Sequence, residues 1–566
     1  VVYDHDTYYG FFHDYNLLGF NFSRNGDIPN RFFHNKQQYV GVKAGYQLKY
    51  TDHHEIKVGI DWRQHTIRHF DIAPSVMRRI NDKNYSFIKT WSSIKEMPAD
   101  RWQEYGTVDA YGFDIYGNEI NKEKKYYDEE GNLLAIAEAP KKPVNFSVYL
   151  QDQITYDNLI INAGLRVDYF DADDKILKNP DNPAVMETAD FIADEAWKDH
   201  GPFLEIQPRF GFSFIPGPKT MFFFQYGKFV QMPEYSQIYS STPSNMTQQI
   251  IQAQNYYKDP AGFGLDPIKS NNFEFGLEQK FNPITTLNIT GFYKNTTHLV
   301  KTTRTSLPSD RWYIDRYYLR LENGDFALAR GVELELVFDR VKRFMGRVNY
   351  TYTDAQGIGS NSTSYQTAVY YETALPQTIH PLNFSRKHVG LINLDYRFGQ
   401  SDGETILSQS GLNLLFKFSS GHPYTRSKAY AGSGELYKLG VYYMDDTRGV
   451  TFTEPIGSST TPWTFTTDLK MDKTFDIGHF RATLYVVINN LFNRKNILNV
   501  YEKTGSPDND GFEKSVKHSA KYYGIQKTLD MYKAINLTNG QSYWDVLDKE
   551  LWGEPRQIHI GVKFTF

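Results

Sequence analysis

The chain has 566 residues and a formal net charge of -4, with 62 Lys and Arg against 66 Asp and Glu. This balance excludes the basic surface of a nucleic-acid-binding protein, so we expect no nucleic-acid partner. No run approaches eighteen consecutive apolar residues, which excludes a helical membrane protein. Aromatic residues make up 16% of the chain, with 42 Tyr and 40 Phe, and they favour sheets and membrane–water boundaries.

Apolar and polar residues alternate along most of the chain, and no stretch of comparable length has a helical period. In the terminal stretch RQIHIGVKFTF, for example, Ile558, Ile560 and Val562 share one face, with Phe564 and Phe566. This period of two is that of a β-strand with one apolar and one polar face. In chain order, the clearest strands are expected at 40–50, 56–62, 159–169, 273–277, 332–338, 348–352, 392–398, 412–418, 480–488 and 556–566.

Short and long connections alternate from residue 50 to the end. Tight turns are expected at 51–54, 156–158, 216–219, 282–285, 339–342, 401–405 and 476–479. Long polar, aromatic-rich loops are expected at 72–143, 174–205, 236–269, 300–326, 356–384, 426–460 and 497–555. A sandwich would scatter its loop lengths and a propeller would repeat at a fixed period. We therefore predict an all-β fold, a transmembrane antiparallel β-barrel with short periplasmic turns and long extracellular loops.

The number of strands expected from the sequence is odd. Fifteen strands are expected from residue 31 onward, and both the first and the last of them run inward. A closed antiparallel barrel of this kind has an even number of strands. One outward strand is therefore missing or lies in the ambiguous segment 1–30, and residues 1–566 are interpreted as a single barrel portion. Taken alone, such a portion is expected to leave two unpaired edges and to insert poorly.

Several runs resemble one family of barrels. They are VYLQDQITYDNLIINAGLRVDYFD (148–171), QPRFGFSFIPGPKTMFFFQYGKFVQMPEY (207–235), FEFGLEQKF (273–281), ARGVELEL (329–336), RVNYTYTDAQG (347–357), FSSGHPYT (418–425), TPWTFTTDLKMDKTF (461–475), VVINNLFNRKN (486–496) and the terminal strand. In this order they resemble the C-terminal barrel of TonB-dependent outer-membrane receptors, particularly those of Bacteroidetes-type bacteria.

The resemblance implies a 22-stranded barrel of which 15–16 strands are visible, with the first strands and the N-terminal plug outside this sequence. It also implies import of a scarce nutrient across the bacterial outer membrane: an oligosaccharide, a peptide or a metal chelate. The expected partners are outer-membrane lipid, the TonB complex acting through the missing N-terminal part, and a surface lipoprotein. The protein would then not be an enzyme. A non-transporting barrel that anchors or scaffolds a surface or secretion complex is the alternative.

Charged residues of both signs are expected on the polar face of the strands, where they would line the lumen and contact the plug. They are Arg166, Asp168, Arg209, Glu333, Glu335, Arg347, Asp468, Asp472 and Arg481. The more specific interpretation is that a substrate passes along these residues. A polar interior is the default for such a barrel, however, and needs no substrate.

Aromatic residues gather in the expected loops, where rings with polar tips could bind a substrate. The candidates are Trp91, Trp102, Tyr256, Tyr257, Trp312, Tyr313, Tyr370, Tyr371, Tyr442, Tyr443, Tyr522, Tyr523 and Trp544. Tyr111, Tyr116, Tyr317, Tyr318 and Trp552 belong to the same pattern. For any single ring, a place in a small core within the loop is the better interpretation.

No catalytic, metal or cofactor site is predicted. The stretch Asp508 to Gly511 with Glu513 lacks the full spacing of a calcium loop. His53 and His54 have no third ligand at a suitable spacing. The chain has no cysteine, which excludes thiolate metal sites and disulfides. The sequence leaves the substrate, the oligomeric state and the moving loops open.

Overall fold

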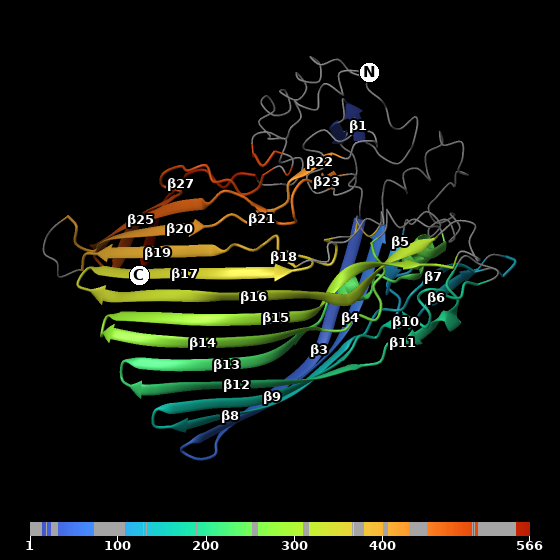
Figure 1. The fold of residues 1–566 in the computed structure, drawn as a ribbon, viewed down its shortest axis with the longest axis horizontal. Helices are drawn as coiled ribbons and strands as arrows, with labels where there is room; N and C mark the ends of the chain where they lie inside the picture. The colour runs from blue at the N-terminus through green and yellow to red at the C-terminus, as the bar shows by residue number, and fades with distance from the viewer. Residues whose placement is uncertain are drawn as a thin grey trace.

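The computed structural model describes residues 14–17, 20–23, 32–72, 108–186, 191–251, 259–308, 316–364, 379–399, 406–429, 450–500 and 551–565, without 128 and 132 and with 366, 369, 502 and 504–507 in addition. Long strands lie side by side along one curved wall. Short turns join them at one end, and the long connections gather at the other (Figure 1).

Among the described residues, fifteen long strands form the wall, which confirms the number expected from the alternation. Their bounds are β3 Phe32–Lys49, β4 His54–Ile72, β8 Val144–Tyr156, β9 Leu159–Asp171, β12 Phe203–Gly217, β13 Thr220–Gln231, β14 Ile268–Asn282, β15 Thr285–Ser306, β16 Tyr317–Val341, β17 Phe344–Gly357, β19 His388–Arg397, β20 Ser410–Ser419, β25 Thr464–Ile477, β26 Phe480–Asn489 and β27 Gln557–Thr565. Two short strands, β5 Val108–Tyr111 and β18 His380–Pro381, extend the wall at the loop end.

Within the described residues, each long strand pairs with the next long strand along the chain, and all of these ladders are antiparallel. The register keeps apolar residues together: Leu277, Ile289 and Leu334 lie directly opposite one another on three adjacent strands. Glu278, Asn288 and Glu335 form the matching row on the opposite face. The sheet therefore has one continuous apolar face and one continuous polar face.

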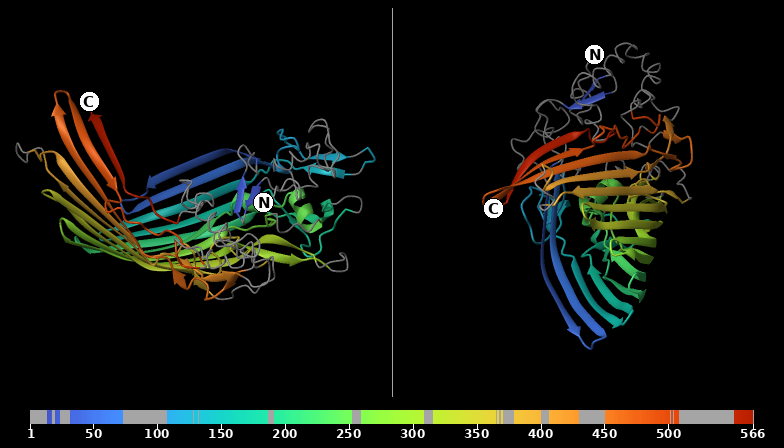
Figure 2. Two further views of the ribbon diagram at one scale, coloured as in Figure 1. Left: turned by 90° about the horizontal axis from the view of Figure 1, so that it is seen from above. Right: turned by 90° about the vertical axis from the view of Figure 1, so that its left-hand side faces the viewer.

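The seam of the ring lies between β27 and β3, which are neighbours in its strand order. Because fifteen is odd, these two strands run in the same direction, whereas every other neighbouring pair of long strands is antiparallel. Almost all described residues of β3 and β27 (blue and red in Figure 2) are exposed on both faces, unlike the half-buried inner strands. The seam is therefore the least covered part of the wall.

The interval 300–326 was expected to be a loop, but strands occupy most of it. β15 continues to Ser306 and β16 starts at Tyr317, and their register is nearly continuous out to Ser306 and Tyr317. The ends of these strands, KTTRTS and YYLRL, are rich in Thr and Tyr, which favour strands without needing an apolar stripe. The two strands thus project beyond the wall as a hairpin.

Short elements cover the loop end. They are β6 Lys124–Tyr127, β7 Leu133–Ala137, β10 Lys175–Leu177, a 3-10 turn Asp194–Ala196, β11 Trp197–Asp199, α3 Tyr235–Ile238, α4 Pro243–Met246, a π turn Thr247–Ile251, β21 Pro423–Tyr424, β22 Ser427–Ala429, β23 Val450–Phe452 and β24 Ser459–Thr460. Among the described residues, no helix is long and apolar enough to cross a membrane.

The connections have apolar cores of their own. One core gathers Met246, Ile250, Phe263 and Tyr318, and Tyr318 is completely buried. A second core includes Tyr111, Tyr239 and Leu265. This packing confirms the interpretation of Tyr111 and Tyr318 as core residues of the loops. In the ambiguous segment 1–30, Asp14–Leu17 and Phe20–Ser23 form the separate hairpin β1–β2.

Glycine and aromatic residues pair across neighbouring strands. In each pair the glycine lies directly opposite an aromatic residue whose ring covers it, so that a Cβ on the glycine would overlap the ring. The pairs are Gly59 with Tyr149, Gly276 with Phe223, Gly331 with Phe292, Gly390 with Phe418 and Gly561 with Tyr485. Such covering restores the packing that a bare glycine lacks and keeps the ring flat against the wall.

Gly331 tests the importance of this covering. In the full-length protein, Gly331→Ala should lower the free energy of unfolding by about 1–3 kcal/mol, because the new methyl overlaps both the Phe292 ring and the Tyr352 carbonyl oxygen. Urea unfolding in detergent micelles, followed by tryptophan fluorescence, measures this. Gly164→Ala is the control, since its Cβ would meet atoms no closer than 3.5 Å. Equal loss in both variants would contradict the account.

Candidate functional site

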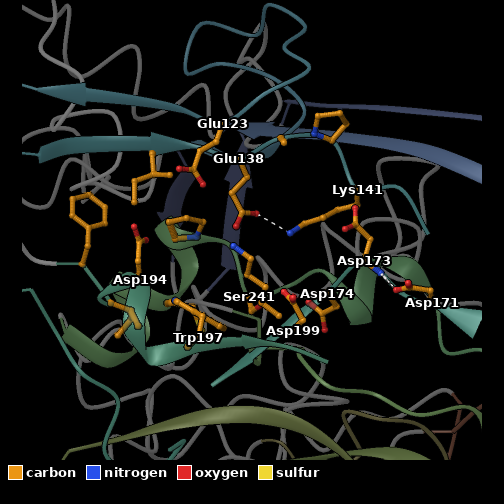
Figure 3. Close-up of a pocket in the computed structure, with 18 of the residues that line it drawn as sticks. Glu123, Glu138, Lys141, Asp171, Asp173, Asp174, Asp194, Trp197, Asp199 and Ser241 are labelled. Atoms are coloured by element: carbon orange, nitrogen blue, oxygen red, sulfur yellow. Dashed lines mark hydrogen bonds and ion pairs between the residues drawn. The ribbon is translucent and has the colours of Figure 1, made fainter. Parts of the chain in front are cut away.

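A pocket of about 540 Å³ opens among the connections at the loop end of the wall. Four connections bring its lining together: 123 and 136–141 before β8, 171–175 after β9, 191–202 before β12 and 241–246 after β13. Because all four flank long strands at the same end, the antiparallel order of β8, β9, β12 and β13 places them side by side (Figure 3).

The pocket is acidic. Its lining includes seven carboxylates and two lysines: Glu123, Glu138, Asp171, Asp173, Asp174, Asp194 and Asp199 with Lys141 and Lys175. Several of these groups already have partners in the protein. The Lys142 backbone N–H donates to Asp173 at 2.7 Å, and the Lys125 ammonium lies 2.9 Å from Asp194.

Asp174 is the most perturbed carboxyl of the pocket. It is buried, and its Oδ2 accepts a hydrogen bond of 3.0 Å from the backbone N–H of Gly264, while its carbonyl oxygen accepts one from the N–H of His200. Burial raises the pKa of Asp174 to about 7, although the Gly264 N–H and the Lys141 ammonium act in the opposite direction. Asp174 is therefore partly protonated near neutral pH.

Lys141 supplies a partly buried positive charge in the pocket. Its Nζ lies 3.2 Å from Glu138 (Figure 3). The same atom lies 5.8 Å from the centre of the Tyr239 ring. Burial would lower the pKa of Lys141, but the carboxylates of Glu138 and Asp174 outweigh this effect and raise it. Lys141 thus stays charged and neutralises part of the acidic lining.

Among the residues that line the pocket, Trp197 has an aromatic ring with a polar group, the indole N–H. It opens β11, lies opposite Leu177, and packs edge-on against Phe263 with ring centroids 6.2 Å apart. The residue is only partly buried. Its ring therefore combines a fixed position with an accessible surface, beside the carboxylate of Asp199 two residues further on.

This lining suits a ligand that donates hydrogen bonds. Carboxylates accept bonds from hydroxyl and ammonium groups, and an indole offers a flat apolar surface. The negative balance disfavours an anionic ligand. Within the part of the chain that the structure describes, no group of three or more His, Asp and Glu is arranged to hold a metal ion.

The nine charged residues predicted to face the lumen lie on the polar face of the wall, and they do not form one site. Arg166 and Asp168 form an ion pair of 2.8 Å, and the Arg209 guanidinium lies over the ring of Phe229 at 4.7 Å. Gln207, which the sequence reasoning did not single out, donates to Asp168. A role for this group in contacting a plug stays a prediction.

The remaining members of that set pair elsewhere along the wall. Arg397 reaches across Gly411 to make two hydrogen bonds of 2.9 and 3.0 Å with Asp472. Three further ion pairs join Arg347 with Glu335 at 3.6 Å, Lys417 with Asp468 at 2.7 Å and Arg481 with Asp476 at 2.9 Å; Glu333 lies opposite Thr290 and Thr351. The pair of Arg397 and Asp472 spans β20, which lies between β19 and β25, and the other three ion pairs join neighbouring strands.

All thirteen aromatic residues predicted to bind substrate, from Trp91 to Trp544, lie outside the described residues. The residues that line the pocket were missed because the sequence reasoning selected aromatic rings in the connections and took their acidic residues as solvated loop surface. A usable signal was present, since 171–174 reads Asp-Ala-Asp-Asp and Asp194, Trp197 and Asp199 follow within one connection.

The wall and the pocket define a class of protein: an antiparallel barrel whose long connections enclose a pocket at one end. Within this class, residues 2–491 match the family model described as "TonB dependent receptor-like, beta-barrel". The chain belongs to this family and is an outer-membrane protein. A search of curated proteins found no match.

Solved structures of similar fold include three transporters. The FrpB iron transporter from Neisseria meningitidis (F3-3 variant) is 14% identical with a TM-score of 0.45, and the match covers 82% of this chain and 52% of that one. The ferric citrate transporter FecA in the unliganded form is 12% identical with a TM-score of 0.42, covering 85% and 53%. The copper transporter OprC is 9% identical with a TM-score of 0.44, covering 84% and 53%. The chain thus spans about half the length of these structures.

The protonation of Asp174 predicts a pH dependence at the pocket. Because its pKa in the folded protein lies above the ordinary value of 3.8, the protonated form stabilises the fold, and this contribution is lost as the pH rises through about 7. Hydrogen exchange at the His200 amide, which donates to the backbone carbonyl oxygen of Asp174 and so reports opening of the pocket lining, should therefore become faster between pH 5 and pH 8, after correction for the intrinsic rate.

Asp174→Asn should make the corrected exchange rate independent of pH over this range, since the amide oxygen still accepts the Gly264 bond without titrating. Asp194→Asn, at an exposed carboxylate of the same pocket, is the control and should keep the dependence of the unmodified protein. A pH dependence that survives in Asp174→Asn would show that another group is responsible.

Proposed function

We propose that this chain is the barrel portion of a TonB-dependent transporter that imports a scarce nutrient and carries out no chemical reaction on it. The observation that carries this proposal is the family match over residues 2–491. The TonB complex would act through a part of the protein that precedes the barrel, and a surface lipoprotein would cover the loops. The same proposal includes a closer relationship of this chain to the receptors of Bacteroidetes-type bacteria.

The substrate would be captured in the acidic pocket between the connections. Its lining favours an oligosaccharide, whose hydroxyls donate to carboxylates and whose ring faces stack on Trp197, or a peptide with amine groups. An anionic metal chelate fits this lining less well, because seven carboxylates against two lysines repel negative charge. The iron, ferric citrate and copper named for the similar structures are therefore not carried over to this chain.

A scaffold that anchors a surface or secretion complex is the second candidate. The long hairpin of β15 and β16 supports it, because a two-stranded projection beyond the wall offers a surface for another protein. Import is favoured over this alternative because the connections enclose a pocket of substrate size rather than a flat face.

Deletion of the gene separates the two functions. Uptake of labelled oligosaccharides, peptides and metal chelates should fall to background for one of these classes. It should return on complementation and be abolished by a protonophore, since TonB-dependent import uses the proton gradient. Intact uptake of all three classes, together with the loss of a surface assembly, would support the scaffold instead.

The pocket itself is tested by Asp199→Asn and Trp197→Phe. Each should raise KM for uptake about tenfold without changing the maximal rate, since each removes a binding contact worth roughly 1.5 kcal/mol. Lys178→Gln is the control, because Lys178 is exposed on the same connection and does not line the pocket. Unchanged KM in both pocket variants, with import intact, would place the binding site elsewhere.

A further inference from the structure

The apolar face of the wall changes character at one level on four adjacent strands, β14 to β17. Toward the turn end, one row of directly opposed residues is apolar or lacks a side chain: Phe275, Gly291, Val332 and Tyr352. Two residues further toward the loops, the next row is Phe273, Tyr293, Arg330 and Asp354. An ion pair therefore lies directly above an apolar surface and beside an aromatic pair.

A shallow groove of about 530 Å³ runs through these rows. Its floor is Gly291, where a Cβ would meet nothing closer than the Phe275 carbonyl oxygen at 3.9 Å. Unlike the glycines that neighbouring rings cover, Gly291 leaves a real gap in the surface. Phe275, Val332 and Tyr352 form the apolar walls, and Arg330 stands at the loop end of the groove.

The position of Arg330 matches the outer edge of a bilayer. Val341, at the turn end of β16, lies eleven residues after Arg330. At about 3.3 Å per residue they span roughly 36 Å along the strand, or about 28 Å along the barrel axis at a tilt of about 40°. The apolar band of such barrels is about 25 Å tall. Arg330 therefore lies at the level of the lipid headgroups and Gly291 at the level of the acyl chains.

The charges at this level favour an acidic headgroup. The Arg330 guanidinium makes bonds of 3.2 and 3.3 Å to one oxygen of Asp354, and Asp354 also accepts a bond of 3.0 Å from Gln356. The Asp354 side chain is only 13% exposed and so is held within the wall, whereas that of Arg330 is 58% exposed. Arg330 thus presents N–H donors to the membrane side, and phosphate is the group that a guanidinium binds best there.

We propose that this groove binds one lipid of the outer leaflet, with an acyl chain lying over Gly291 and a phosphate headgroup bound by Arg330. Shape and charge act together in this site. The missing side chain at Gly291 makes room for hydrocarbon, and Asp354 fixes the guanidinium at the height where the phosphate of that lipid lies.

Native mass spectrometry of the full-length protein in detergent tests the proposal with matched probes. Dioleoylphosphatidic acid should bind about tenfold more tightly than dioleoylglycerol, which has the same chains without the phosphate. Inorganic phosphate at the same concentration should not displace the bound lipid. Equal binding of the two lipids, or displacement by inorganic phosphate, would overturn the assignment.

Variants locate the site. Arg330→Gln combined with Asp354→Asn should reduce binding of the phosphatidic acid to that of the diacylglycerol, and Gly291→Leu should reduce binding of both lipids. The charge control is Arg63→Gln with Asp61→Asn, which removes an ion pair of 2.8 Å on the polar face. Gly164→Leu is the control for added bulk on the polar face. Loss of binding in the controls to the same extent as in the site variants would overturn the proposal; if Gly291→Leu does not fold, the charge pair alone decides.

Discussion

The backbone hydrogen bonds of the wall are the constraint on which the rest of this structure depends. In hydrocarbon there is no water to satisfy an N–H or C=O group, so every strand that meets lipid needs a paired neighbour on each side. The unbroken order of antiparallel ladders from β3 to β27 meets this need along the chain. The requirement also explains why the seam between β27 and β3 is the weakest part: two strands that run in the same direction cannot continue the antiparallel pattern, and both are exposed on both faces.

Pairing fixes the register, and the register decides what each face of the wall can do. On the apolar face, opposed rows of aliphatic and aromatic side chains meet lipid, and the row of Arg330 and Asp354 marks the outer end of that contact. On the polar face, cross-strand contacts such as Arg397 with Asp472 satisfy charges locally. Glycines opposite aromatic rings leave room for these bulky side chains to lie against the wall.

At the loop end this constraint is relaxed, because water can satisfy the backbone N–H and C=O groups there. The connections are long enough to build apolar cores around residues such as Tyr318 and Tyr239. These cores fix the carbonyl and amide groups that position Asp174 and Lys141 in the acidic pocket. The pocket therefore depends on packing between connections that are far apart in the sequence, and its charge depends on burial as much as on composition.

The order of apolar and polar residues is enough to predict the wall. The period of two, the alternation of turns and loops and the count of fifteen strands follow from the residues, because each strand must present one face to lipid and one to the interior along its whole length. The family also followed from local runs such as VVINNLFNRKN.

Contacts between the connections could not be predicted from the sequence. It placed a loop at 300–326, where Thr- and Tyr-rich strands continue in water without the apolar stripe that marks a membrane strand. It also directed attention to loop aromatics rather than to Asp174, Lys141 and Trp197. Those three residues come together in the folded protein, where the Asp174 carboxyl is buried near the Lys141 ammonium. Their proximity depends on how separate connections pack against one another, and neither the composition of these connections nor their spacing in the sequence specifies that packing.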